Sequence, residues 1–450
     1  MTNNDSGKVP TTPSSSVRTT PRRVVWASFV GTALESYDFY VYAYFAAIFV
    51  GPLFFEPLGE VSATLAGLVT FGVAFFFRPL GAVIFGWIGD RIGRRRTLLV
   101  TVLLMGIATG FIGVLPDFQT AGWLGAILLV LLRIGQGLAL AGEWGGAVLL
   151  ATEQNDTKRR AFWASFPQLG SPVGSILSGA LFLVLFATIN SEDMLAWGWR
   201  IPFLTAFPLL LVSLYLRWSI NETPVFKAIE AAGARVRVPI AAVFRSQPVA
   251  VIVAIGAALL GIGSYSLMNT YTLDYGAGVL GYDYMQLLTA TTIGGLLQLI
   301  TIPLFGWWAT KIGSARVVAI GAIGTLIIAF PIYFLLQSAT VPILIGMMLI
   351  GGILPTMSWA ALGGLMHDLF DSRFAYTALS ISYAVAAMIS GLVPGATKLI
   401  GETTGNAWWH PGVVLAVLSV ITLVAAIAAS RMRPPADEFR EPQPELATAR

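Results

Sequence analysis

Two carboxylates lie one helical turn apart within the first long apolar stretch of the sequence, where residues 33 to 44 read ALESYDFYVYAY. Glu35 and Asp38 have no basic residue within ten positions on either side. Ionisable side chains in such stretches are rare, and they usually face a cavity or one another. We therefore expect this pair to require a cation, a cavity or a bound proton supplied by the rest of the fold.

Three more charged residues lie inside long apolar stretches. Arg78 is followed by Pro79, whereas Arg133 and Glu143 belong to one stretch. Arg133 lies about ten residues, or roughly 15 Å of helix, from the start of that stretch. The side chain is too deep to reach water easily, so we expect it to bind an anion.

The composition identifies the environment of these charges. Hydrophobic residues make up 56% of the 450 residues and charged residues only 11%, whereas a soluble domain carries about 25% charged residues. Apolar runs of about twenty residues or more recur along the chain, as in proteins with many membrane-spanning helices. We therefore predict an all-α membrane protein. The absence of cysteine excludes disulfides and thiolate metal sites.

Apolar runs between polar breaks predict twelve transmembrane helices. The longest loop, residues 220–247, separates a six-helix bundle at 24–219 from a second one at 248–430. Residues 1–23 are rich in Ser, Thr and Pro and predict a disordered tail, and 431–450 form a second tail. The predicted spans are 24–50, 63–88, 97–115, 123–152, 162–190, 200–219, 248–275, 284–309, 317–337, 341–366, 374–399 and 411–430.

The basic residues predict the orientation of these helices. Most of the 27 Lys and Arg residues lie in the two tails or in loops on the same side as the tails. Cytoplasmic loops carry an excess of Lys and Arg. Both termini and the linker 220–247 are therefore predicted to be cytoplasmic.

The two halves share a sequence repeat. FGWIGDRIGRRR at 85–96 aligns with FGWWATKIGSAR at 305–316, each after an even-numbered predicted helix. Parallel repeats of six spans are known from transporters that bind substrate between the halves near the membrane midplane. The repeat predicts two pseudo-symmetric bundles with a site between them.

Several motifs carry a resemblance to a known family. GWIGDRIGRRR resembles the loop motif of the major facilitator superfamily. ESYDFYVY, FFFRPLGAVIFGWIGDRIGRRR, LRIGQGLALAGEWGGA, GWRIPFL and NETPVF together resemble its metabolite:proton symporter family, and 66–152 looks most like the shikimate-transporter branch. The resemblance implies a carrier of the bacterial inner membrane for shikimate, dicarboxylates, citrate or zwitterionic osmolytes, driven by protons. The second-half loop departs from the motif, with Thr310 opposite Asp90.

The resemblance implies a partner for Arg133. In the superfamily the first and fourth helices line the central cavity, and Asp38 and Arg133 lie at similar predicted depth. We hypothesise that ionised Asp38 holds Arg133, and that protonation of Asp38 releases it to bind a substrate carboxylate. The alternative is a static ion pair that only fixes helix packing. Glu35 is a second proton station, a contact for a substrate cation or a structural residue.

Substrate-binding residues are predicted in both halves. Arg78 belongs to the family's RPLG element and is a second candidate for binding a carboxylate, the alternative being a bond to helix backbone or a neighbouring acid. Glu143 lies among closely spaced glycines, where it lines the cavity, acts in gating or serves packing. Neutral groups that suit a hydroxylated small anion are Gln168, Tyr265, Asn269, Trp359 and Tyr383.

The loop motif predicts a gate. Asp90 ends a helix and can accept hydrogen bonds from the N-terminus of the eleventh helix near Phe374. Arg94 and Arg95 can pair with Glu153 at the inner end of the fourth helix. These contacts are expected to close the cytoplasmic side while the carrier is open outward.

Together with the resemblance, these observations predict a proton-coupled symporter that imports a small organic anion, such as shikimate, as a monomer. No cofactor, metal or nucleic acid is expected. A proton-driven exporter of the same fold and an importer of a zwitterionic osmolyte are the alternatives. A membrane enzyme is disfavoured, because the sequence has no metal cluster, nucleophile triad or nucleotide-binding loop.

Overall fold

The computed structural model describes residues 21–433 except 156 and 339, together with 435 and 439. The described chain is helical and has no strand. Eleven of its helices are long and apolar enough to cross a membrane. The remaining predicted span is α1 (Pro21–Ile48), whose 28 residues include Glu35 and Asp38. Residues 1–20, on which most of the first predicted tail falls, lie outside the described residues.

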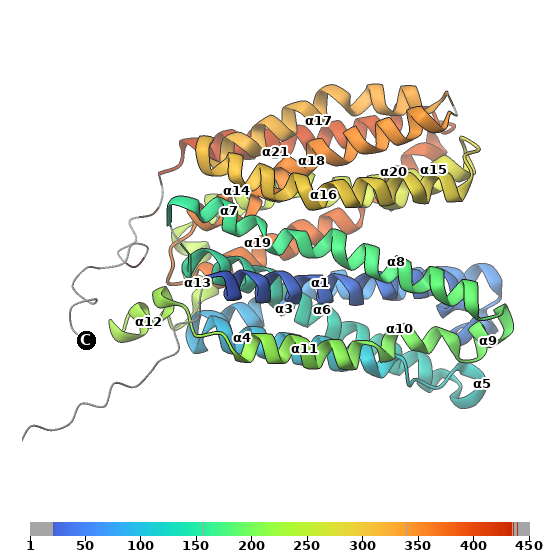
Figure 1. Ribbon diagram of the computed structural model, residues 1–450, viewed down its shortest axis with the longest axis horizontal. Coiled ribbons are helices and arrows are strands. Elements are labelled where there is room, and N and C mark those ends of the chain that lie inside the picture. The colour runs from blue at the N-terminus through green and yellow to red at the C-terminus, as the bar shows by residue number, and fades with distance from the viewer. Residues whose placement is uncertain (1–20, 156, 339, 434, 436–438, 440–450) are drawn as a thin grey trace, which may run out of the picture.

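The helices form two bundles that lie side by side (Figure 1). We call the end at which α1 begins and α21 ends the tail side. The first bundle consists of α1, α2 (Val50–Phe54), α3 (Glu60–Ile92), α4 (Arg94–Ile112), α5 (Phe118–Ala121), α6 (Trp123–Glu153), α7 (Arg160–Ser165), α8 (Gly170–Thr188), α9 (Ser191–Ala196), α10 (Ile201–Leu204) and α11 (Ala206–Trp218).

The second bundle follows a linker that contains two short helices, α12 (Pro224–Ala231) and α13 (Pro239–Ser246), on the tail side (Figure 1). Its helices are α14 (Pro248–Ser266), α15 (Thr272–Gly278), α16 (Tyr284–Ile312), α17 (Ser314–Leu336), α18 (Val341–Leu369), α19 (Ala375–Gly391), α20 (Val393–Thr403) and α21 (His410–Arg431).

Five predicted spans are interrupted. α1 and α2 are separated at Phe49, α10 and α11 at Thr205, and three further spans break as follows. A 3-10 turn at Pro167–Leu169 joins α7 to α8, because proline cannot donate the hydrogen bond of a continuous helix. A π-helical turn at Leu267–Tyr271 joins α14 to α15, and such turns are frequent at functional sites. Leu392 separates α19 from α20 just before Pro394.

Small residues set the distance between neighbouring helices. A Cβ atom at Gly137 of α6 would overlap the backbone of Ala74 on α3, and one at Gly81 of α3 would overlap the backbone of Leu138 on α6. Close approach of backbones at small residues is the usual packing of membrane helices. This contact fixes α3 against α6, and these helices carry Arg78, Arg133 and Glu143.

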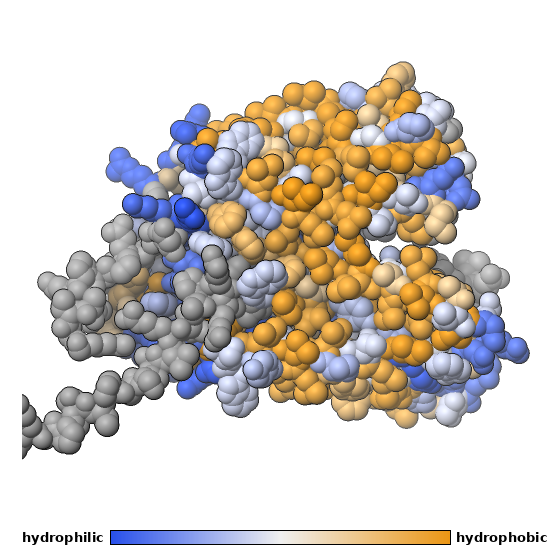
Figure 2. All heavy atoms as spheres, viewed as in Figure 1, coloured by the Kyte–Doolittle hydropathy of each residue, from blue (hydrophilic) through white to orange (hydrophobic). Residues whose placement is uncertain are grey.

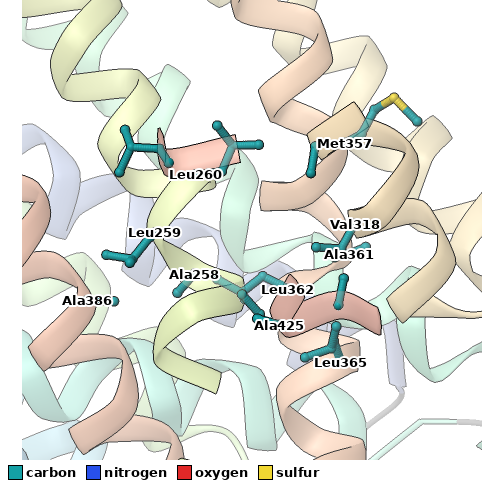
Figure 3. Close-up of a cluster of buried hydrophobic side chains, with 14 of the residues drawn as sticks. Ala258, Leu259, Leu260, Val318, Met357, Ala361, Leu362, Leu365, Ala386 and Ala425 are labelled. Carbon is teal, nitrogen blue, oxygen red and sulfur yellow. The ribbon is translucent and has the colours of Figure 1, made fainter. Parts of the chain in front are cut away.

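Apolar side chains cover the middle of the molecule and polar ones its ends (Figure 2), as a bilayer requires. The interior of the second bundle is also apolar. Figure 3 shows part of its core, where α14, α17, α18, α19 and α21 meet through Leu, Val, Met and Ala side chains. Leu260, Val318 and Leu362 in this cluster are completely buried.

Candidate functional site

The two bundles are joined on the tail side by Asp90 at the end of α3. Its carboxylate accepts hydrogen bonds from the backbone N–H groups of Tyr376 (3.1 Å) and Thr377 (2.9 Å) in the first turn of α19. A carboxylate is favourable at a helix N-terminus because the free N–H groups and the helix dipole point toward it. The predicted contact between Asp90 and the start of this helix is therefore present.

Arg94 extends the same contact. Its side chain is completely buried, lies 3.7 Å from Asp90 and 3.6 Å from Glu153, and donates a 2.8 Å hydrogen bond to the Ser372 carbonyl of the second bundle. One guanidinium thus holds α3, α6 and the segment before α19 together. The tail side is closed by buried, charge-assisted hydrogen bonds, which are stronger than neutral ones.

A cavity of about 70 Å³ lies where the bundles face each other nearer the middle of the molecule. Ser171 of α8 contributes from the first bundle, and α14, α16, α18 and the π-helical turn contribute from the second. Tyr265, Asn269 and Trp359, three of the predicted substrate-binding residues, line it. Figure 2 shows a recess between the bundles at the end opposite the tails.

Gln168, Trp359 and Tyr383 meet beside this cavity. The Trp144 indole donates to the Gln168 side chain at 2.9 Å, and Gln168 donates to the Trp359 carbonyl at 3.2 Å. The Tyr383 ring stacks on Trp144 with ring centroids 4.2 Å apart and lies 6.2 Å from the Trp359 ring. The predicted groups of both halves are thus in contact, with Trp144 as an added member.

Arg78 lies buried in the membrane-spanning part of α3, close to this aromatic group. Its guanidinium carbon is 4.6 Å from the ring centre of Phe75 and 5.7 Å from that of Phe39. It lies near enough to Glu35 and Tyr383 for electrostatic interaction with both. Among the described residues it forms no ion pair, and its Nε has no hydrogen-bond partner. Arg78 is therefore a buried cation held by aromatic faces.

The predicted direct contact between Asp38 and Arg133 is wrong for this conformation. Arg133 instead donates to the backbone carbonyls of Thr70 (3.2 Å) and Phe71 (3.0 Å) on α3, and its guanidinium carbon lies 3.7 Å from the ring centre of Tyr42. Asp38 accepts a 3.1 Å hydrogen bond from Thr109 of α4. Equal depth did not bring the side chains together, because Arg133 turns toward α3.

Two residues that were not predicted connect them. Arg133 donates to the Gln136 side chain at 2.7 Å, Gln136 donates to the Thr109 hydroxyl at 2.7 Å, and Thr109 donates to Asp38. Each of these three hydrogen bonds is donated in the direction of the Asp38 carboxylate. Asp38 and Arg133 therefore belong to one hydrogen-bonded network across α1, α4 and α6.

Glu143 lies inside the first bundle rather than at the cavity between the bundles. It forms an ion pair with Arg217 near the end of α11, and Arg217 also donates a 2.9 Å hydrogen bond to the Leu98 carbonyl. Both side chains are at most 3% exposed. Glu35 interacts electrostatically with Glu143, Arg217 and Arg78.

Comparison with known proteins identifies the family. Residues 24–237 match the family model described as sugar (and other) transporter, and 280–449 match that of the major facilitator superfamily. The chain is 36% identical over 433 residues to the inner membrane metabolite transport protein YhjE of Escherichia coli K12, covering 91% of this chain and 94% of that protein. The chain belongs to the major facilitator superfamily.

Other members of the superfamily are similar over the same length. The shikimate transporter of Escherichia coli K12 is 35% identical over 417 residues, which cover 92% of this chain and 94% of that protein. The proton:xylose symporter XylE bound to 6-bromo-6-deoxy-D-glucose superposes with a TM-score of 0.74 at 19% identity, covering 92% of this chain and 96% of that one. The twelve-helix fold of the superfamily and its two bundles are thereby confirmed, and this chain is a multi-pass membrane transporter.

One gating residue of this major facilitator was assigned the wrong partner. Arg95 does not pair with Glu153; its backbone N–H donates to the Glu222 carboxylate at 3.2 Å, and its side chain donates to the Trp218 carbonyl at 2.6 Å. Arg94 and Arg95 are successive residues of a helix, so their side chains point about 100° apart. Only Arg94 faces Glu153.

Arg217 and Trp144 were also missed as partners of the charged and aromatic groups of this transporter. Arg217 stands one residue before the end of α11, where an arginine is expected at the membrane surface. The sequence around Arg217 does not indicate that its side chain is buried beside Glu143. The one sequence signal for Trp144 is a second alignment of the two halves, at an offset of 215 residues, in which it matches Trp359.

Proposed function

We propose that this transporter is a proton-coupled symporter that imports a small organic anion, such as shikimate or a related hydroxylated carboxylate, by alternating access. It acts as a monomer in the bacterial cytoplasmic membrane, with the tail side facing the cytoplasm. The observation that carries the proposal is Arg78, a buried cation beside the contact between the bundles that has no ion-pair partner among the described residues.

A buried guanidinium without an anion is costly, and a substrate carboxylate would offset that cost through a bidentate pair of hydrogen bonds. Arg133 is less suited to this task because its guanidinium already donates to two carbonyls and Gln136. Arg217 is paired with Glu143. Of these three buried arginines, Arg78 has the most capacity left for a ligand.

Neutral groups next to Arg78 suit the rest of such a substrate. Tyr383 interacts with Arg78 electrostatically and lies beside Trp359. Tyr265 and Asn269 line the same interbundle cavity as Trp359. Hydroxyl and amide groups in a mostly apolar pocket bind hydroxylated ligands with defined orientation.

The proton is assigned to Asp38, with Glu35 as its neighbour. Among the described residues, Asp38 has a hydrogen bond from Thr109 and no ion pair, so protonation removes no contact with a cation. Glu35 interacts electrostatically with both Asp38 and Arg78. A proton taken up by these acids reduces the negative charge that competes with a substrate carboxylate for Arg78. Proton binding and anion binding thereby favour each other.

Alternating access then requires the tail-side contacts of Asp90 and Arg94 to break once proton and substrate are bound. The structure, closed on the tail side, corresponds to the state before this opening. The excess of Lys and Arg in the tail-side loops supports a cytoplasmic location for that side.

A zwitterionic osmolyte is the second candidate substrate. Trp144, Tyr383 and Trp359 form a group of adjacent rings, and aromatic rings bind quaternary ammonium groups. The glycine betaine/proline/ectoine/pipecolic acid transporter OusA of Dickeya dadantii is 31% identical over 422 residues. In this case Arg78 would bind the carboxylate and the rings the ammonium group.

The test is uptake into proteoliposomes that contain the full chain, with an imposed proton gradient. Uptake of labelled shikimate, succinate, citrate and glycine betaine is compared with and without a protonophore. Arg78→Lys, which keeps the positive charge, is the control for Arg78→Gln. We expect an acid to accumulate above its external concentration only while the gradient lasts. Accumulation of betaine alone would select the second candidate, and gradient-driven export of all substrates would contradict import.

A further inference from the structure

A second, smaller cavity lies inside the first bundle, away from the second bundle. It has a volume of about 20 Å³ and is lined by residues of α1, α4, α6 and α11. Three of its lining residues are acids, namely Glu35, Asp38 and Glu143. The others are apolar or glycine, with the exception of Ser213.

Ser213 shows that the cavity is suited to a polar ligand. Its side chain is 3% exposed, and its hydroxyl oxygen has no hydrogen-bond partner among the described residues. A buried hydroxyl is almost always hydrogen-bonded, to protein or to water. Ser213 therefore needs a polar partner that the described residues do not supply.

The volume of the cavity and its polar lining residues indicate which ligand it can hold. A cavity needs about 10 to 15 Å³ to hold one water molecule, together with two to four polar partners. The acids and Ser213 provide those partners. Among the described residues, no group of three or more acids, histidines or cysteines is arranged to hold a metal ion, so a water molecule fits better than a cation.

We infer that this cavity holds a buried water molecule that connects Asp38 with Glu143, and that the coupling proton passes along it to Glu143. The inference rests on the proposed proton coupling. It makes Glu143 a proton-transfer residue and gives the proton a route inside the first bundle, separate from the substrate route between the bundles.

The transfer is balanced through the water molecule. The protonated Asp38 gives its proton to the water oxygen, and the water gives one of its own protons to the Glu143 carboxylate. Asp38 becomes ionised, Glu143 becomes neutral, and the water is unchanged. Arg217 loses its anionic partner but keeps its hydrogen bond to the Leu98 carbonyl.

The structure also indicates how Glu143 is shielded from the tail side. The hydroxyl of Tyr376 on α19 donates a 2.6 Å hydrogen bond to the carbonyl of Gly142, the residue before Glu143. Tyr376 is completely buried. When α19 separates from the first bundle during opening of the tail side, this cover is removed and Glu143 can release its proton to water.

The water molecule is tested without any transport assay. Met105 lines the cavity and Met348 lies in the apolar core of the second bundle, and both are 4% exposed. Hydroxyl radicals generated by brief X-ray irradiation oxidise side chains next to buried water. We expect Met105 to be oxidised at least about threefold faster than Met348, and Ser213→Val, which fills the cavity, to remove the difference. Equal rates in the wild-type chain would overturn the water site.

The proton route is tested in proteoliposomes with the acid that the wild-type chain accumulates best. Glu143→Gln should lower gradient-driven accumulation about 100-fold and leave exchange of labelled for unlabelled substrate within about twofold, because exchange needs no net proton transfer. Ser213→Val should also lower gradient-driven accumulation without loss of exchange. It tests the proton route by itself if Glu143→Gln does not reach the membrane. Ser390→Val makes the same change at a buried serine of the second bundle whose hydroxyl also has no hydrogen-bond partner within the described part of the chain, and should behave as wild type.

Wild-type accumulation by both Glu143→Gln and Ser213→Val would overturn the route while leaving the proposed symport intact. Loss of substrate exchange in Ser213→Val would also overturn it, because the cavity would then serve substrate movement. A wild-type chain that accumulates no acid would refute the proposed function instead, and the oxidation of Met105 would still test the water site.

Discussion

The two bundles share a fold and a repeat but differ in what their spans bury. The first bundle buries Asp38, Arg78, Arg133, Glu143 and Arg217, whereas the described spans of the second bury no Asp, Glu, Lys or Arg. At the offset of 215 residues that aligns Trp144 with Trp359, Arg133 and Glu143 correspond to Met348 and Ser358 of the second bundle. Met348 belongs to the apolar core, and Ser358 donates to the Val318 carbonyl at 3.1 Å.

This difference shows that the fold itself does not need buried charge. The second bundle packs its own six spans around a core of apolar side chains (Figure 3) and neutral polar ones, so the buried charges of the first bundle are an added cost. Burying charged groups costs several kcal/mol per ion even when they are paired. We interpret the first bundle as the part that handles protons and the second as the part that shapes the substrate cavity.

The largest expected effect is on the stability of the first bundle. Arg217→Gln leaves Glu143 buried without a cation and should lower the free energy of unfolding by about 3 to 5 kcal/mol. The double variant Glu143→Gln with Arg217→Gln should recover most of that loss. Ser358→Ala, at the corresponding place in the second bundle, should cost about 1 kcal/mol. Denaturant unfolding in detergent measures all three, and equal losses in both bundles would remove the distinction.

The next effect concerns the substrate carboxylate. Arg78→Gln should raise the half-saturation concentration for the transported acid about 100-fold, which corresponds to the 2 to 5 kcal/mol lost when one partner of a buried charged pair is removed. Arg78→Lys should retain part of the affinity because it keeps the charge. Substrate binding measured by calorimetry separates this effect from a loss of transport. Unchanged affinity in Arg78→Gln would exclude Arg78 as the anion site.

An intermediate effect is expected at the tail-side gate. Asp90→Asn weakens two hydrogen bonds to the start of α19 and should shift the population toward the tail-side-open form about tenfold, or about 1.4 kcal/mol. The chain has no cysteine, so spin labels on cysteines introduced at the exposed Arg96 and Arg316 report the distance between the bundles. Thr310→Val, at the position corresponding to Asp90, should leave that distance distribution unchanged, because Thr310 only donates to the Gly306 carbonyl of its own helix.

The smallest effect is expected in the neutral lining of the second bundle. Asn269 lines the interbundle cavity and donates a 3.3 Å hydrogen bond to the Tyr265 carbonyl of its own helix turn. Asn269→Ala should raise the half-saturation concentration about three- to tenfold, the worth of one neutral hydrogen bond. Uptake kinetics measure it. A rise in the half-saturation concentration as large as that of Arg78→Gln would mean that substrate recognition does not depend on charge in the first bundle.

The sequence predicted the parts of this structure that depend on position along the chain. Long apolar runs located the spans, the repeat located the two bundles, and the acid at the end of α3 was matched with the start of α19. Each of these follows from hydropathy or from the chemistry of a helix terminus. Positions along a helix axis are fixed by counting residues.

The contacts that were predicted wrongly depend on direction around the helix axis. Arg133 lies at the depth of Asp38 but bonds to α3, and Gln136 and Thr109 lie between them. Arg95 differs from Arg94 by one residue and bonds to other partners. Arg217 is buried although it lies near a helix end. Packing between helices decides these directions, and a single sequence does not specify it.

Asp38→Asn tests most directly whether the first bundle carries the coupling proton. In proteoliposomes with an imposed proton gradient, the variant is compared with the wild-type chain for net accumulation and for exchange of labelled substrate. We predict that exchange continues at a rate within about threefold of wild type while accumulation against a concentration gradient is lost. Accumulation by Asp38→Asn to the wild-type level, with the same dependence on the proton gradient, would contradict the assignment.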